Sequence, residues 1–168
     1  MILKTERLSI HPFEGKDQAT MVRLLTDRKI KDTYTIPDFD CEEKVIRLFL
    51  RFMDLSHDDS RVVAGIYLDG RLIGFLNDTG IDGKNIELGY VIDPAYHNQG
   101  YMTEALQGAI AWLLEHGFEQ VITGAFARNA ASIRVMEKCG MSKMEKTETI
   151  DYRGTAEPCV YYHIAHGR

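Results

Sequence analysis

Hydrophobic and polar positions repeat with two different periods along this chain, and the change of period marks its elements. Residues 7–13 (RLSIHPF) alternate apolar and polar side chains, which is typical of a half-buried strand. The next two segments space apolar residues three and four apart, which predicts amphipathic helices over residues 16–30 and 41–56. The loop between them (KDTYTIPDFD) is either a packed connector or part of the mouth of a substrate site.

The second half of the chain predicts more strands than helices. Apolar runs at residues 61–68 and 71–78 flank Asp69-Gly70, a dipeptide typical of a β-hairpin. Further elements are expected as a strand at 86–93, a helix at 103–118, a strand at 120–127, a helix at 130–140, and a terminal hairpin of 142–152 and 159–165. This order predicts an α+β (mixed α/β) fold, in which a mostly antiparallel sheet has helices on both faces.

Composition adds few constraints. A chain of 168 residues with 45% hydrophobic content suits one domain over residues 1–168. No apolar run approaches the roughly 20 residues of a membrane-spanning helix, and the opening MILKTERLSI lacks a signal-peptide pattern, so we expect a cytoplasmic protein without membrane contact. Three cysteines at no metal-ligand spacing predict free thiols and no metal site, and a net charge of −5 argues against nucleic acid as a partner. An exposed final strand leaves a homodimer open.

One polar turn stands between an apolar strand and a helix, and it contains Gly100 (residues 97–102, HNQGYM). The first N–H groups of a helix lack intrahelical partners, and the macrodipole places about half a positive charge there. Such a turn can seat a phosphate or diphosphate, and a glycine lets the anion approach the backbone. An ordinary strand-to-helix turn would use a glycine equally well, and this stretch alone favours that simpler reading.

A second junction of the same kind follows the next strand. The segment ARNAASIRVMEKCGM starts a helix there, with Asn129 as the candidate N-cap. Two such junctions in succession predict that the fourth and fifth strands of the sheet splay apart to admit a ligand.

Together, VIDPAYHNQGYMTEAL and RNAASIRVMEKCGM resemble the two signature segments of the GNAT superfamily of N-acetyltransferases. Residues 100–105, the residues from Asn129 to Met141, and the opening LKTERLSIHPF are similar to the branch that includes the ribosomal-protein N-terminal (alanine/serine) acetyltransferases. The order of elements matches the family over essentially the whole chain. The resemblance implies direct transfer of an acetyl group from acetyl-CoA to a primary amine, either a protein N-terminus or a small molecule.

The resemblance also implies a set of cofactor-binding residues. Backbone amides of the loop would hold the diphosphate of acetyl-CoA, at His97, Asn98, Gln99, Gly100, Tyr101 and Met102. His97 and Met102 depart from the family pattern, which has Gln or Arg at the first position and Gly or Ala at the last. The backbone of Tyr90, Val91 and Ile92 would pair with the pantetheine arm as an added strand would. Asn129 would bind that arm, cap its helix, or do both.

Acetyl transfer needs a neutral amine. Neutralising a lysine-like amine at pH 7 costs about 4.6 kcal/mol, whereas an α-amino group costs about 1 kcal/mol. Glu87 is the candidate base, because it lies on the strand that leads to the loop, near the position of the catalytic carboxylate in some family members. It shares a strand face with Gly89 and Val91, and a solvated or salt-bridged glutamate is the alternative reading.

The proton donor to the departing thiolate is less well marked. Many family members have a tyrosine where this chain has Met136, which cannot donate a proton. Ser132 is the nearest hydroxyl and the candidate donor, although a serine in the first turn of a helix is commonly a cap; Tyr161 and Tyr162 are alternatives. Met136 therefore leaves a second function open, that of a catalytically silent acyl-CoA-binding or sensing domain.

Overall fold

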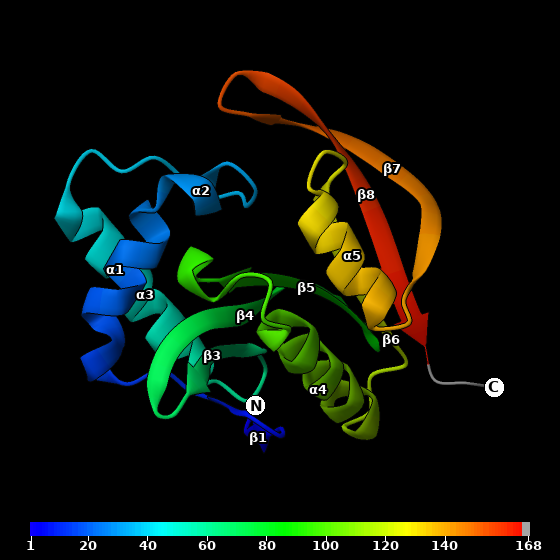
Figure 1. Ribbon diagram of the computed structural model, residues 1–168, viewed down its shortest axis with the longest axis horizontal. Coiled ribbons are helices and arrows are strands. Elements are labelled where there is room, and N and C mark those ends of the chain that lie inside the picture. Colours follow the sequence, from blue (N-terminus) through cyan, green and yellow to red (C-terminus); the bar gives the residue numbers. More distant parts are fainter. Residues whose placement is uncertain (166–168) are drawn as a thin grey trace.

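A computed structural model describes residues 1–165 of the chain (Figure 1). Its elements are β1 (Leu3–Lys4), β2 (Leu8–His11), η1 (Gly15–Asp17), α1 (Gln18–Thr26), α2 (Arg28–Lys31), α3 (Glu42–Ser56), β3 (Val63–Leu68), β4 (Arg71–Asp82), β5 (Asn85–Ile92), η2 (Pro94–Tyr96), α4 (Tyr101–Glu115), β6 (Gln120–Phe126), α5 (Ala130–Lys138), β7 (Ser142–Tyr152) and β8 (Thr155–Ala165). Eight strands form one sheet in the order β1-β2-β3-β4-β5-β6-β8-β7, and among the described strands β5 and β6 form the one parallel pair. The predicted mixed architecture is confirmed.

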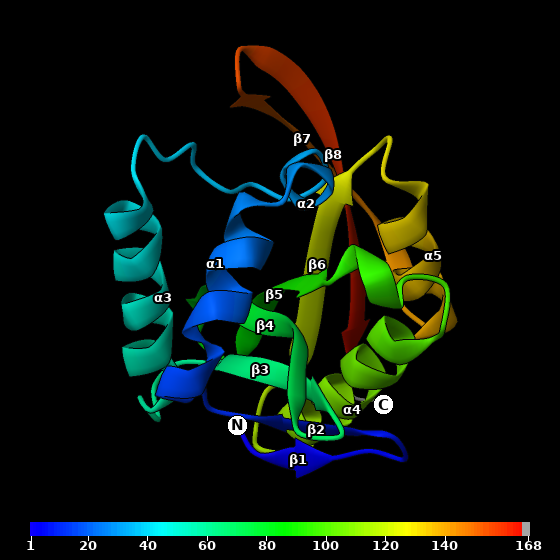
Figure 2. The same ribbon diagram turned by 60° about the vertical axis from the view of Figure 1, so that its left-hand side comes forward.

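Helices cover both faces of the sheet and create two hydrophobic cores (Figure 2). Leu88 on β5 packs in one core with the apolar stripe of α4, which includes Leu106, and with the inner side of α5, which includes Met136. Val91, also on β5, packs in the other core with Leu24 of α1 and Phe49 of α3. Alternate residues of β5 therefore face opposite layers, as the strand period predicts.

The prediction of a single helix over residues 16–30 is wrong in one respect, because this segment forms two helices, α1 and α2. Asp27 leaves the helical region, with a ψ of 128°, and its carboxylate accepts hydrogen bonds from the backbone N–H groups of Lys29 and Ile30. An aspartate in this conformation caps the helix that follows it. The apolar spacing continues across the break and does not reveal it.

β4 is longer than predicted and is irregular near its end. Its pairing with β5 shifts register between Asp78 and Gly80, which marks a β-bulge at Thr79. The predicted turn at Asp69-Gly70 is present, and both residues have positive φ, 49° and 75°.

The two central strands part beyond the middle of the sheet. The β5–β6 ladder pairs residues 85–88 with 120–123 and then stops. β5 stays paired with β4 as far as Ile92, and β6 stays paired with β8 as far as Phe126. Each strand thus follows its own half of the sheet (Figure 2). β5 and β6 are the fourth and fifth of the strands predicted from the sequence, so the predicted splay is confirmed.

None of the helices within residues 1–165 is long and apolar enough to cross a membrane.

Candidate active site

A cavity of about 570 Å³ lies where β5 and β6 separate. Tyr34 lines it from the layer of α1 to α3, and Ser132 lines it from α5. Gly124 and Ala125, which are neighbours on β6, line it as well. Residues from the helical layers on both faces of the sheet therefore border the cavity.

The turn before α4 forms one wall of this cavity. Gly100 is the N-cap of α4 with a φ of 81°, and Asn98 also has a positive φ of 60°. Both residues line the cavity, together with Tyr101 and Met102. In the described part of the chain, the N–H groups of residues 98–102 donate no hydrogen bond to another residue. The positive end of α4 thus faces the cavity with free donors, which is an arrangement suited to an anion.

Arg7 supports this turn from behind, a role that sequence reasoning did not find. Its Nη1 donates to the carbonyl of Gln99 at 3.1 Å, and its Nε donates to Glu104 at 2.6 Å. Its guanidinium lies 4.4 Å from the ring centroid of Tyr101. The side chain of Gln99 donates to the carbonyl of Ala95 at 3.2 Å, and Gln99 does not line the cavity.

The two departures from the family pattern have local explanations. The imidazole Nε2 of His97 lies 3.2 Å from the carbonyl oxygen of Ile92, so the ring lies against its own turn. The side chain of Met102 is buried in the core beneath α4. Met102 therefore leaves the turn uncrowded while its backbone N–H remains free.

Asn129 caps α5, and the cap leads to a pair of hydroxyl groups. The Oδ1 of Asn129 accepts from the backbone N–H of Ser132 at 3.1 Å. The hydroxyl of Ser132 lies 2.6 Å from that of Tyr90, and both residues line the cavity. Burial raises the pKa of Tyr90 to about 12, so its phenol is protonated at neutral pH. The Tyr90–Ser132 contact joins β5 to α5, and their separation in the chain hid it from sequence reasoning.

The other candidate donors do not reach the cavity. Met136 is fully buried, and its sulfur accepts a hydrogen bond from Thr123. The hydroxyl of Tyr162 donates to Glu137 of α5 at 3.4 Å. Tyr161 points to the opposite face of β8, and neither tyrosine lines the cavity. Of the candidate donors named from the sequence, Ser132, which contacts Tyr90, is the one that lines the cavity.

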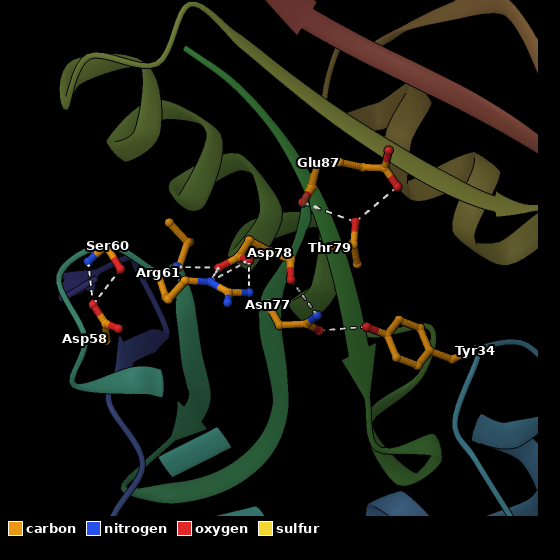
Figure 3. Close-up of polar contacts among 9 residues, drawn as sticks. Tyr34, Asp58, Ser60, Arg61, Asn77, Asp78, Thr79 and Glu87 are labelled. Carbon is orange, nitrogen blue, oxygen red and sulfur yellow. Dashed lines mark hydrogen bonds and ion pairs between the residues drawn. The ribbon is translucent and has the colours of Figure 1, made fainter. Parts of the chain in front are cut away.

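Glu87 on β5 does not line the cavity. Its side chain lies beside Thr79 (Figure 3). Its Oε1 accepts from the hydroxyl of Thr79 on the bulge at 3.0 Å. Two residues further on, a Cβ at Gly89 would lie 2.3 Å from the hydroxyl oxygen of Tyr34, which donates to Asn77 at 2.7 Å. Tyr34 therefore packs directly on the β5 backbone, between Glu87 and the mouth of the cavity.

Three further cations line the cavity, namely Lys29 on α2 and Arg134 and Lys138 on α5. Arg134 and Lys138 are four residues apart and therefore lie on one side of α5. This spacing is visible in the sequence and could have predicted a pair of cations beside the site. These charges surround the same space as the free amides.

Comparison with known proteins identifies the family. Residues 7–142 match the family model of the acetyltransferase (GNAT) domain. The chain belongs to the GNAT family. The uncharacterised N-acetyltransferase YnaD of Bacillus subtilis (strain 168) is 30% identical to it over 150 residues, which cover 85% of this chain and 84% of YnaD.

Solved structures agree with this assignment. A GNAT-family acetyltransferase from Bacillus anthracis has a TM-score of 0.83 and 26% identity, with 98% of each chain covered. RimL, a ribosomal L7/L12 alpha-N-protein acetyltransferase solved with coenzyme A, has a TM-score of 0.87 and 16% identity, again with 98% of each chain covered, and shows the shared fold. The GNAT chain described here is an N-acetyltransferase.

The two candidate catalytic groups of this N-acetyltransferase lie on opposite faces of the sheet. Ser132 and Tyr90 lie on the side of α5 and border the cavity, whereas Glu87 lies on the side of Tyr34 and outside the cavity lining. Within residues 1–165, no group of three or more His, Cys, Asp or Glu side chains is arranged to hold a metal ion.

Proposed function

We propose that this GNAT enzyme transfers an acetyl group directly from acetyl-CoA to a primary amine, either a protein N-terminus or a small molecule. One observation carries the proposal. The free amides of Asn98, Gly100, Tyr101 and Met102 and the parted ends of β5 and β6 border the same cavity. A diphosphate and an extended thioester arm need such adjacent sites.

The residues present suit acetyl-CoA. The amides of residues 98–102 would hold its diphosphate, and Lys29, Arg134 and Lys138 supply positive charge for its phosphates. Beyond Leu88, the edge of β5 that faces β6 has no ladder partner in the described residues, so the backbone of residues 90–92 can pair with the pantetheine arm. When bound, acetyl-CoA supplies the acetyl thioester.

Glu87 acts in this proposal as the base that takes a proton from the acceptor. Its carboxylate is fixed by Thr79 and partly exposed, so it can exchange protons with a bound amine or through water. An α-amine needs only about 1 kcal/mol to lose its proton at pH 7, against about 4.6 kcal/mol for a lysine side chain. The smaller cost favours α-amino acceptors, the class that the name of RimL specifies for that protein.

The hydroxyl pair stabilises the departing sulfur and does not protonate it fully. Burial raises the pKa of Tyr90 to about 12, whereas an alkyl thiol has a pKa near 8.5. Proton transfer from Tyr90 through Ser132 to a thiolate would be uphill by about 5 kcal/mol. Ser132 thus donates a hydrogen bond, with its position set by Tyr90, and the net proton comes from the acceptor or water.

We place this activity in the cytoplasm, since Cys41, Cys139 and Cys159 all carry free thiols.

The experiment is a thiol-release assay with acetyl-CoA and a panel of peptides with free N-termini and small amines. The proposal predicts turnover with at least one acceptor class and a mass increase on the acceptor nitrogen. Tight acetyl-CoA binding without turnover on any acceptor would instead support the silent acyl-CoA-binding domain, for which the buried Met136 is the motivating observation.

A further inference from the structure

The ammonium group of Lys146 lies beside Glu87, on the face of the sheet opposite α5. In the β7–β8 ladder, Lys143 pairs with Tyr162 and Thr147 pairs with Val160, so three residues of β7 stand opposite one of β8. The surplus residues form a bulge. It is this bulge that carries Lys146 over the face of the sheet.

Aromatic and acidic groups surround this ammonium group. The Nζ of Lys146 lies 3.9 Å from the ring centroid of Tyr161 and 4.0 Å from Oε2 of Glu87. The hydroxyl of Tyr161 donates to Glu148 at 2.6 Å. Burial, the bond to Glu148 and the charge of Glu87 raise the pKa of Tyr161, so the phenol stays protonated. An aromatic face flanked by two carboxylates is a receptor for an ammonium ion. We call Tyr161, Glu87 and Glu148 the ammonium site.

The ammonium site adjoins the cavity through β6. Gly124 lines the cavity, and a Cβ at this position would lie 2.8 Å from the ring of Tyr161. Because Gly124 has no side chain, the ring packs directly against the backbone at the opening. A cation on the ring is therefore close to the place where β5 and β6 part.

We propose that the ammonium site binds the acceptor as an alkylammonium ion, and that Lys146 occupies the site until the acceptor displaces it. This inference rests on the proposed N-acetyl transfer. The side chains of Lys146 and Glu87 are 48% and 33% exposed, and ion pairs between partly exposed side chains are weak. An incoming ammonium ion can therefore replace Lys146, which makes Lys146 a specificity-determining residue that competes with the acceptor.

The test compares Lys146→Met with Lys143→Met. Lys143 is an exposed lysine of the same strand and provides a matched loss of charge before the bulge. Each protein, saturated with coenzyme A, is titrated with n-hexylammonium chloride and with hexan-1-ol, and amide chemical shifts near Gly124 report binding. Lys146→Met should bind the ammonium ion about two- to five-fold more tightly than wild type. Lys143→Met should match wild type, and the alcohol should not distinguish the proteins.

Equal affinity of wild type and Lys146→Met for the ammonium ion, or no binding to either protein, would overturn the proposal. A second variant, Tyr161→Leu, removes the aromatic face and should weaken the preference for the ammonium ion over the alcohol; an undiminished preference also overturns the proposal. Melting temperatures establish that each variant is folded. The titration measures amine binding and needs no turnover. An absence of acetyl transfer would therefore refute the proposed function, while the titration would still test the ammonium site.

Discussion

Replacing Gly100 by valine tests whether the turn before α4 binds the cofactor, and Gly117 at the other end of the helix provides the control. Both glycines have positive φ, 81° and 99°. A Cβ would meet only Arg7 at 3.4 Å in the first case and nothing within 4 Å in the second. A left-handed conformation costs an L-residue about 1–2 kcal/mol, so both variants should lose about that much unfolding free energy. Their melting temperatures should fall by about 2–8 °C.

Only the variant at Gly100 should also lose cofactor affinity. Gly100 lines the cavity, and the turn that its substitution would strain carries the free amides. Displacing one charge-assisted hydrogen bond costs about 1.5–3 kcal/mol, or roughly 10- to 150-fold in the dissociation constant. Calorimetric titration with coenzyme A measures this directly. Wild-type affinity in Gly100→Val, or an equal loss in Gly117→Val, would refute the assignment of the turn.

The remaining predictions concern catalysis and acid stability. Ser132→Ala should slow single-turnover acetyl transfer about 10-fold with acetyl-CoA affinity unchanged, and Tyr90→Phe should do so to a smaller extent; full rates would leave Ser132 with only its structural contact to Tyr90. Glu87→Gln should lower turnover most at low pH, where acceptors are protonated, and an unaltered pH–rate profile would remove Glu87 from the mechanism. Burial alone would raise the pKa of Glu104, but hydrogen bonds led by that from Thr5 outweigh it and lower the pKa from its ordinary 4.5. The stability from this carboxylate is complete above about pH 4.5 and lost as pH falls through the lower folded-state pKa, so Glu104→Gln should flatten the acid side of melting curves; an unchanged acid side would contradict this.

The elements of the fold could be predicted where the signal is local. The spacing of Leu24 and Phe49 with their neighbours indicated two amphipathic helices, and both residues are buried. The break at Asp27 was missed because a cap depends on one residue's backbone conformation, which the apolar period does not report. The bulge at Thr79 was missed because it depends on pairing with another strand.

The candidate site likewise has a part that the sequence predicts and a part that only the packing of distant elements creates. The turn at Gly100 and the cap at Asn129 follow from residues close in sequence, and the structure places both on the cavity. Arg7 reaches the turn from 92 residues away, and Tyr90 meets Ser132 across 42 residues. Such contacts depend on how the elements pack, which one sequence does not report. Lys146 shows this most clearly, because a strand bulge decides which face it occupies.

The most direct measurement of the central claim is a backbone ¹H–¹⁵N titration of the protein with coenzyme A. Hydrogen bonds from the amides to a diphosphate should move the resonances of residues 98–102 downfield, with smaller shifts at Gly124 and Ala125 on β6. If coenzyme A binds while the amides of residues 98–102 keep their positions, the anion site and the mechanism built on it are contradicted.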